Sequence, residues 1–211
     1  MSECHLFGNG PSYKVAPSTP IEHSYGCNIS IAERPVRAIG CVDNGYVIQR
    51  LVDQVKKKND GTCVYLTAAV ARHLDKTLMR ESWIQKVLEY GWSTESRLNY
   101  QFNCGQVMAH FLSKRYEVVN LWGFDSLSTG DISSWHHDLP DSHLCIMPPN
   151  KHPAAVKGFI TREEKNEHWM ISWQKLVSDL GHKTIFVNNM PSPNGTIKTE
   201  VLNDLFTNLR T

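Results

Sequence analysis

Residues 105–125, GQVMAHFLSKRYEVVNLWGFD, contain the clearest helix–strand unit of the chain. Apolar side chains recur at helical spacing from Gly105 to Lys114, which predicts an amphipathic helix there. The run Val118–Trp122 is short and apolar, which predicts a strand, and Gly123-Phe124-Asp125 ends it. A helix that leads directly into a strand is the repeating unit of α/β folds, so this stretch decides the expected fold class.

The same alternation of short apolar runs and amphipathic segments extends over most of the chain. The further strands that we expect are Cys4–Phe7, Tyr25–Ile31, Val36–Val42, Thr62–Ala68 and Lys183–Val187. The further helices that we expect run from Asp43-Asn44 to about Lys58, and over Arg80–Tyr90, Arg162–Leu180 and Lys198–Leu209. Strands connected by crossover helices predict a mostly parallel sheet in a single Rossmann-like α/β domain that spans residues 1–211.

Composition and charge favour one domain with small-molecule chemistry. A chain of 211 residues with 41% hydrophobic content can bury a substantial core. Its formal charge of +1 gives no electrostatic reason to expect a nucleic-acid groove or an anionic membrane surface. The N-terminus lacks the features of a signal peptide, and no window approaches the roughly 18 consecutive apolar residues of a membrane span. We therefore expect a cytoplasmic protein without a transmembrane segment.

The six cysteines, at positions 4, 27, 41, 63, 104 and 145, lie far apart and include no Cys-x-x-Cys pair. This spacing suits neither a disulfide scaffold nor a zinc ribbon. We expect most of these thiols to be reduced and partly buried.

The segment 126–161 differs in composition from the rest of the chain. It is rich in Ser, His, Asp and Pro and has no sustained periodicity, which predicts a long, lid-like loop. Within it, His136-His137-Asp138, Asp141, His143 and Cys145 are of the types that bind transition metals. No established metal-ligand spacing appears among them, so we expect a polar lid without a metal and keep a metal site as the alternative.

The first expected strand ends in Gly8-Asn9-Gly10-Pro11-Ser12. The glycines allow a ligand to approach the backbone closely, and Asn9 and Ser12 add short polar groups. In an open α/β sheet this loop lies at the carboxyl edge, where ligands bind, so we interpret it as a ligand site. A tight turn is the alternative. The loop is not the Gly-x-Gly-x-x-Gly dinucleotide fingerprint, because Pro11 removes an amide and no acidic partner follows at the expected spacing.

Three further places could line the same crevice. Asn28 and Asp43 each fall near the carboxyl end of an expected strand, although Asp43 could instead cap the next helix. Asn103-Cys104-Gly105 precedes a helix, whose first amides and dipole attract anions. An N-cap with a glycine for close packing explains these three residues equally well.

His168, which follows the expected lid, is a candidate general base. An imidazole can remove a proton from an acceptor hydroxyl near neutral pH. A lone histidine with a structural role is the alternative.

Several of these motifs, in their order along the chain, resemble those of bacterial sialyltransferases and the wider sialyltransferase-like glycosyltransferases. They are Gly8-Asn9-Gly10-Pro11-Ser12, Cys27-Asn28, Asn103-Cys104-Gly105, Leu121-Trp122-Gly123-Phe124-Asp125 and His168. The resemblance covers roughly residues 4–190. It implies a single Rossmann-like domain that binds a CMP-activated sugar, needs no metal or other cofactor, and inverts the anomeric centre on transfer to a glycan hydroxyl.

The resemblance also implies roles for individual residues. Asn9, Gly10 and Ser12 would hold the nucleotide phosphate and ribose, Gly105 would contact the cytosine region, and His168 would be the base. The donor site that we expect comprises Gly8, Asn9, Gly10, Ser12, Asn28, Asp43, Asn103, Cys104, Gly105 and Asp125. An oxocarbenium-like transition state needs a stabilised leaving phosphate and a base for the attacking hydroxyl, which this set would supply.

The chain departs from the family in two places. Cys104 stands where the family usually has a serine, and Ser126–Asp138 lacks the tyrosines that hold the departing phosphate in the bacterial enzymes. His136 or His137 could take over that contact. Two alternatives follow: a non-catalytic nucleotide-binding module, or an enzyme resembling archaeal pterin pyrophosphokinases, which open with a similar loop and require ATP and magnesium.

Overall fold

The computed structural model describes residues 2–8, 10–27, 34–42, 46–89, 103–125, 127, 171–178, 180, 184–191 and 197–207. The expected lid at 126–161 lies outside the described residues except for Leu127, which is buried. The capping positions Asp43 and Asn44 also lie outside them.

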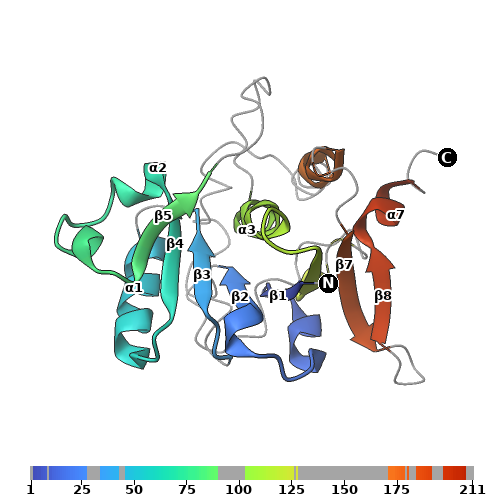
Figure 1. Cartoon of the computed structure of the whole chain (residues 1–211), viewed down its shortest axis with the longest axis horizontal. Coiled ribbons are helices and arrows are strands. Elements are labelled where there is room, and N and C mark those ends of the chain that lie inside the picture. Colours follow the sequence, from blue (N-terminus) through green and yellow to red (C-terminus); the bar gives the residue numbers. More distant parts are fainter. Residues whose placement is uncertain are drawn as a thin grey trace, which may run out of the picture.

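Within these residues, eight strands form one sheet in the order β5-β4-β3-β2-β1-β6-β7-β8 (Figure 1). The strands are β1 (Glu3–Phe7), β2 (Ser24–Cys27), β3 (Ala38–Cys41), β4 (Cys63–Thr67), β5 (Ile84–Leu88), β6 (Val118–Trp122), β7 (Thr184–Pro191) and β8 (Ile197–Val201). All neighbouring strands are parallel except β7 and β8. The expected mostly parallel α/β fold is therefore confirmed.

Helices pack on both faces of this sheet. Among the described residues, the α-helices include α1 (Tyr46–Lys58), α2 (Ala68–Ala71), α3 (Cys104–Ser113) and α7 (Leu202–Thr207), and the 3-10 helices are η1 (Pro11–Val15), η2 (Ile21–His23) and η3 (Leu78–Arg80). Residues 171–178 and 180 are also helical, which confirms that part of the helix expected over Arg162–Leu180. None of the described helices is long and apolar enough to cross a membrane.

Two apolar clusters lie on the two faces of the sheet, one on each face. On one face, α3 packs with Trp173 and Leu176 over alternate residues of the strands, such as Leu6 and Leu121. On the other face, the apolar stripe of α1 packs against the intervening strand residues, such as Ile39. Because side chains alternate along a strand, β1, β3, β4, β5 and β6 each contribute to both clusters.

The prediction of a helix over Arg80–Tyr90 is wrong, because η3 ends at Arg80 and the edge strand β5 follows. The spacing of Ile84, Val87 and Leu88 fits a helix, which explains the error. In the structure Ile84 pairs with Val64, and an irregularity in the pairing of β4 with β5 follows. Ile84 packs in the cluster beneath α1, whereas Leu88 packs in the cluster beneath α3. Pairing with β4 thus overrides the helical pattern.

The C-terminal prediction is only partly right. Of the helix expected over Lys198–Leu209, the segment Leu202–Thr207 is α7, but Ile197–Val201 is the antiparallel strand β8. Pairing with β7 supplies the backbone hydrogen bonds of β8, and the fully buried Leu202 begins the helix. The strand expected over Thr62–Ala68 is slightly shorter in the structure, since Thr67 ends β4 and caps α2 by accepting a hydrogen bond from the Val70 amide at 3.2 Å.

The strand order creates a switch point at the centre of the sheet. From β1 the chain builds β2 to β5 on one side, and β6, β7 and β8 then lie on the other side. In open α/β sheets ligands bind at the carboxyl edge where the order reverses. The loops that follow β1 and β6 are therefore where a ligand site is expected.

A chain of side-chain hydrogen bonds crosses four strands, β8, β7, β6 and β1. Thr199 Oγ1 donates to Asn188 Oδ1 at 2.8 Å, and Asn188 Nδ2 donates to Asn120 Oδ1 at 3.3 Å. Asn120 Nδ2 in turn donates to Glu3 Oε1 at 2.7 Å. Every amide donates in the same direction, toward the Glu3 carboxylate, so the bonds polarise one another. This ladder satisfies two asparagines that are buried in parallel strands.

We expect Asn188→Ala to lower the free energy of unfolding by about 1–3 kcal/mol, because Asn120 and Thr199 each lose a partner. Urea unfolding of the two proteins measures the difference. Gln49→Ala, which removes an exposed amide that bonds Asp53 within α1, should cost less than about 0.5 kcal/mol. Equal effects of the two substitutions would contradict a role for the ladder.

His5 on β1 is held in its neutral form. Its Nδ1 accepts a hydrogen bond from Trp122 Nε1 at 3.2 Å, which requires an unprotonated Nδ1. Burial lowers the pKa of His5 below its ordinary value of 6.5, and the Glu3 carboxylate opposes this only in part. The folded protein therefore binds fewer protons at this position than the unfolded chain does.

We expect this histidine to reduce stability in acid. Because the pKa of His5 is lower in the folded state, the free energy of unfolding should fall as the pH drops from about 7.5 to about 5.5. Denaturant unfolding at the two pH values, compared between the parent protein and His5→Gln, measures this contribution. His73→Gln, the same substitution at an exposed histidine, is the matched control, and a change in pH dependence as large as that of His5→Gln would contradict the role of burial at His5.

Candidate functional site at the switch point

The loops after β1 and β6 are joined by backbone hydrogen bonds. The Gly8 amide donates to the Trp122 carbonyl at 2.7 Å, and the Gly10 amide donates to the Gly123 carbonyl at 2.9 Å. The parallel pairing of β1 with β6 therefore continues past the ends of both strands. The two loops that flank the switch point form one unit.

Close backbone approach explains the glycines of this unit. A Cβ atom on Gly8 would lie 2.6 Å from the Gly123 carbonyl oxygen. A Cβ on Gly10 would overlap Asp125 Oδ2, and Gly123 itself has a φ of +76°. Only glycine fits these positions without displacing the neighbouring backbone. The contact between the two loops is thus a sufficient reason for each glycine, and the interpretation as a ligand approach stays a prediction.

Ser12 connects the two loops through its side chain. Its Oγ donates to Asp125 Oδ2 at 3.0 Å and accepts a hydrogen bond from the Gly123 amide at 2.7 Å. Its own amide also donates to Asp125 Oδ2, at 3.1 Å. Ser12 is fully buried, and Asp125 is nearly so. The Ser12 hydroxyl is therefore engaged within the protein, and its direct effect is to fix the position of the Asp125 carboxylate.

Asn103 caps the helix that faces this unit. Its Oδ1 accepts from the Gln106 amide at 2.9 Å, and Gln106 Oε1 accepts from the Asn103 amide at 2.9 Å. This reciprocal pair is a capping box, so the N-cap alternative for Asn103 is confirmed. The cap sets the direction in which α3 starts, and its first-turn amides point away from the helix body.

Cys104 anchors the start of α3 to β3. Its Sγ donates to the Gly40 carbonyl at 2.9 Å, and the thiol is buried. A Cβ on Gly40 would overlap Met108, so the glycine allows α3 to lie directly on the strand. The thiol is a hydrogen-bond donor, as a serine hydroxyl would be. The departure from the expected serine therefore has a structural use in this chain.

Phe124 links α3 to the helix at 171–178. A Cβ on Gly105 would overlap the ring of Phe124, so the first turn of α3 rests on this ring. Trp173 packs edge-on against the same ring, with ring centroids 5.9 Å apart. Phe124 thus joins three elements at the carboxyl edge. The strand pattern ending in Gly-Phe-Asp predicted the position of Phe124 but gave no indication of these partners.

The structure brings together seven of the predicted site residues. They are Gly8, Gly10, Ser12, Asn103, Cys104, Gly105 and Asp125. The remaining predicted positions, Asn9, Asn28, Asp43, His136, His137 and His168, lie outside the described residues. Gly40 was missed by the sequence reasoning, although a glycine inside a strand pattern is a known signal for a close backbone approach.

The chemistry of this site is that of a buried carboxylate beside a helix start. Asp125 is a strong acceptor for hydroxyl or amino groups, while the dipole of α3 favours negative charge at its first turn. Among the described residues, no group of three or more His, Cys, Asp or Glu side chains could hold a metal ion. The arrangement suits a ligand that carries both hydroxyl donors and an anionic group.

Comparisons with known proteins identify no relative: no family model, no curated protein and no solved structure matches this chain.

We expect Ser12→Ala to destabilise the protein by about 1–3 kcal/mol, because it leaves the buried Gly123 amide without its acceptor. Chemical denaturation measures the change. Ser18→Ala, the same substitution at an exposed position, should stay within about 0.5 kcal/mol of the parent protein. A loss of stability from Ser18→Ala as large as that from Ser12→Ala would contradict a structural role for the hydrogen bonds of Ser12.

Proposed function

We propose that this protein is a metal-independent, inverting glycosyltransferase of sialyltransferase type that binds a CMP-activated sugar at the switch point. The observation that supports this most is the rigid unit of Gly8, Gly10, Ser12 and Asp125 opposite the start of α3. Loops at a switch point are the usual ligand position in open α/β sheets. The proposal therefore rests on two points: the resemblance of the sequence motifs, and a switch-point site whose groups suit a ligand with hydroxyls and a phosphate.

Within this proposal, Asp125 and α3 have different tasks. The Asp125 carboxylate repels a phosphate and accepts well from hydroxyls, so we assign it to the ribose of the donor. The phosphate then belongs at the first turn of α3, beside Gly105, where the helix dipole stabilises the leaving CMP. Ser12 acts as a positioning residue that holds Asp125, and not as a phosphate ligand. This assignment changes the role that the resemblance implies for Ser12.

His168 is the general base of the proposed reaction. It would take the proton of the acceptor hydroxyl as the sugar–phosphate bond breaks and the new glycosidic bond forms. Trp173, five positions later in the sequence, packs against Phe124 of the switch-point loop. The helix that contains Trp173 therefore contacts the proposed donor site.

We expect saturable binding of CMP, measured by calorimetry or saturation-transfer NMR, with weaker binding of UMP and AMP. His168→Ala should abolish transfer but change CMP affinity by less than about twofold, because the base acts on the acceptor. His73→Ala, which removes an exposed histidine on another part of the chain, should leave both unchanged. Absence of any preference for CMP would overturn the proposed donor, and unchanged transfer by His168→Ala would overturn the base.

One observation favours a non-catalytic nucleotide-binding module as a second candidate. The polar side chains of Ser12, Asn103 and Cys104 all make hydrogen bonds within the protein. A rigid site of this kind can bind a nucleotide without promoting transfer. Tight CMP binding together with no turnover of a CMP-sugar, over a panel of glycan acceptors, would favour this candidate.

A further inference from the structure

A second cluster of polar side chains lies at the opposite, amino edge of the sheet, on the face covered by α3. It consists of Arg37, Arg115, Tyr25, Tyr65 and Tyr116, which we call the arginine–tyrosine cluster. Tyr25 and Tyr65 belong to β2 and β4, Arg37 directly precedes β3, and Arg115 and Tyr116 follow α3. The cluster is therefore built from residues of three neighbouring strands and from the segment that follows one helix.

The backbone of Arg37 is fixed between two strands. Its amide donates to the Ser24 carbonyl at 2.9 Å, and its carbonyl accepts from the Cys63 amide at 2.9 Å. The side chain is exposed, and its Nη1 donates to the Glu22 carbonyl at 3.5 Å. The Tyr25 phenol, which carries a negative charge when it is ionised, is the first cause of the raised pKa of Arg37. The backbone places Arg37 near Tyr25, because the next residue, Ala38, pairs with Tyr25.

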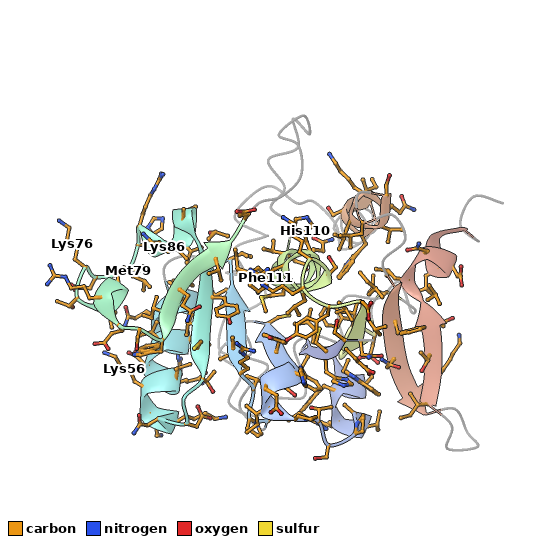
Figure 2. The ribbon with its side chains drawn as sticks, viewed as in Figure 1. Lys56, Lys76, Met79, Lys86, His110 and Phe111 are labelled. Carbon is orange, nitrogen blue, oxygen red and sulfur yellow. The ribbon has the colours of Figure 1, made fainter. Side chains whose placement is uncertain are left out.

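Arg115 is oriented by an aromatic ring. Its guanidinium carbon lies 3.6 Å from the ring centroid of Phe111, which is labelled on α3 in Figure 2. Its Nη1 donates to the Phe111 carbonyl at 3.1 Å, and Phe111 packs edge-on against Tyr65 with centroids 5.4 Å apart. A guanidinium has five N–H donors in a fixed plane. Stacking therefore fixes that plane while leaving most of its edge for a ligand.

The tyrosines provide neutral hydroxyl groups at the rim of the core. The hydroxyl oxygens of Tyr25 and Tyr116 are 2.8 Å apart, and the two rings pack at 64°. Burial is the first cause of a raised pKa for both Tyr25 and Tyr65, so their phenols stay protonated at neutral pH. Protonated phenols can donate hydrogen bonds to an anion.

No carboxylate neutralises the two arginines within the described part of the chain. None of the ion pairs between described residues includes Arg37 or Arg115. Of the nearby acids, Glu89 pairs with Lys114 at 3.6 Å, and Glu117 accepts from the Ser2 amide at 2.8 Å. Arg37 directly precedes Ala38, the strand partner of Tyr25, and Arg115 directly precedes Tyr116, whose hydroxyl oxygen lies 2.8 Å from that of Tyr25. Both arginines are therefore next to residues that contact Tyr25.

We propose that the arginine–tyrosine cluster is a binding site for a phosphate monoester dianion. Two planar guanidinium groups match the geometry of phosphate oxygens, and hydroxyl donors can satisfy the lone pairs that remain. The cluster lies at the edge of the sheet opposite the switch point, so this site is separate from the proposed donor site. Its ligand is a small phosphorylated molecule or free phosphate, which share this chemistry.

The test is a titration of the whole protein with inorganic phosphate and with phenyl phosphate in a phosphate-free buffer, followed by calorimetry. We expect saturable binding that is much stronger than that of chloride. Arg37→Gln and Arg115→Gln should each weaken it about tenfold or more, since each removes a charge-assisted contact. Arg72→Gln, the same substitution at an exposed arginine on another part of the chain, should leave the affinity unchanged. Preference for phenyl phosphate over inorganic phosphate would identify the ester as the ligand.

A second measurement does not depend on substitutions that alter folding. In protein with labelled tyrosine rings, phosphate should shift the NMR signals of Tyr25, Tyr65 and Tyr116, and CMP should not displace it from this cluster. Equal weakening by Arg72→Gln, equal affinity for chloride, or shifts that spare these three tyrosines would each overturn the proposal. Failure of CMP binding with retained phosphate binding would reject the proposed function alone.

Discussion

The hydroxyl of Ser12 is the contact on which the carboxyl edge depends. It donates to Asp125 and accepts from the Gly123 amide, so it closes the space between the loops after β1 and β6. This closure brings the backbones so near that Gly8 and Gly10 cannot be replaced by larger residues without movement. The carboxylate is consequently held in place before any ligand arrives. A site of this kind loses little conformational freedom on binding.

The parts of the fold that could be predicted from the sequence are those that local patterns determine. The unit α3–β6 has a complete helical stripe followed directly by an apolar strand, and the structure matches it closely. The two errors, at β5 and β8, fall on the two edges of the sheet. An edge strand has one neighbour and a partly exposed face, so its apolar pattern is weak. Its identity comes from pairing with β4 or β7, which no local window of sequence contains.

The same distinction applies to the candidate site. The capping box joins Asn103 and Gln106, which are three positions apart, and can be recognised in the sequence. Ser12 and Asp125 are 113 positions apart, so their hydrogen bond follows only from the parallel pairing of β1 with β6. The glycine motif is ambiguous for a physical reason. A glycine that admits a ligand and a glycine that admits another loop require the same absence of a side chain.

The two edges of the sheet offer anions different environments. At the carboxyl edge the described residues provide a buried carboxylate and the partial charges of a helix start, which favour a ligand with few full charges and several hydroxyls. At the amino edge Arg37 and Arg115 provide two full positive charges that are exposed to solvent. Attraction by exposed charges is screened by salt, whereas contacts with buried dipoles are screened much less. Ionic strength should therefore separate the two proposed kinds of binding, because only a ligand held mainly by the arginines would lose affinity steeply as salt is added.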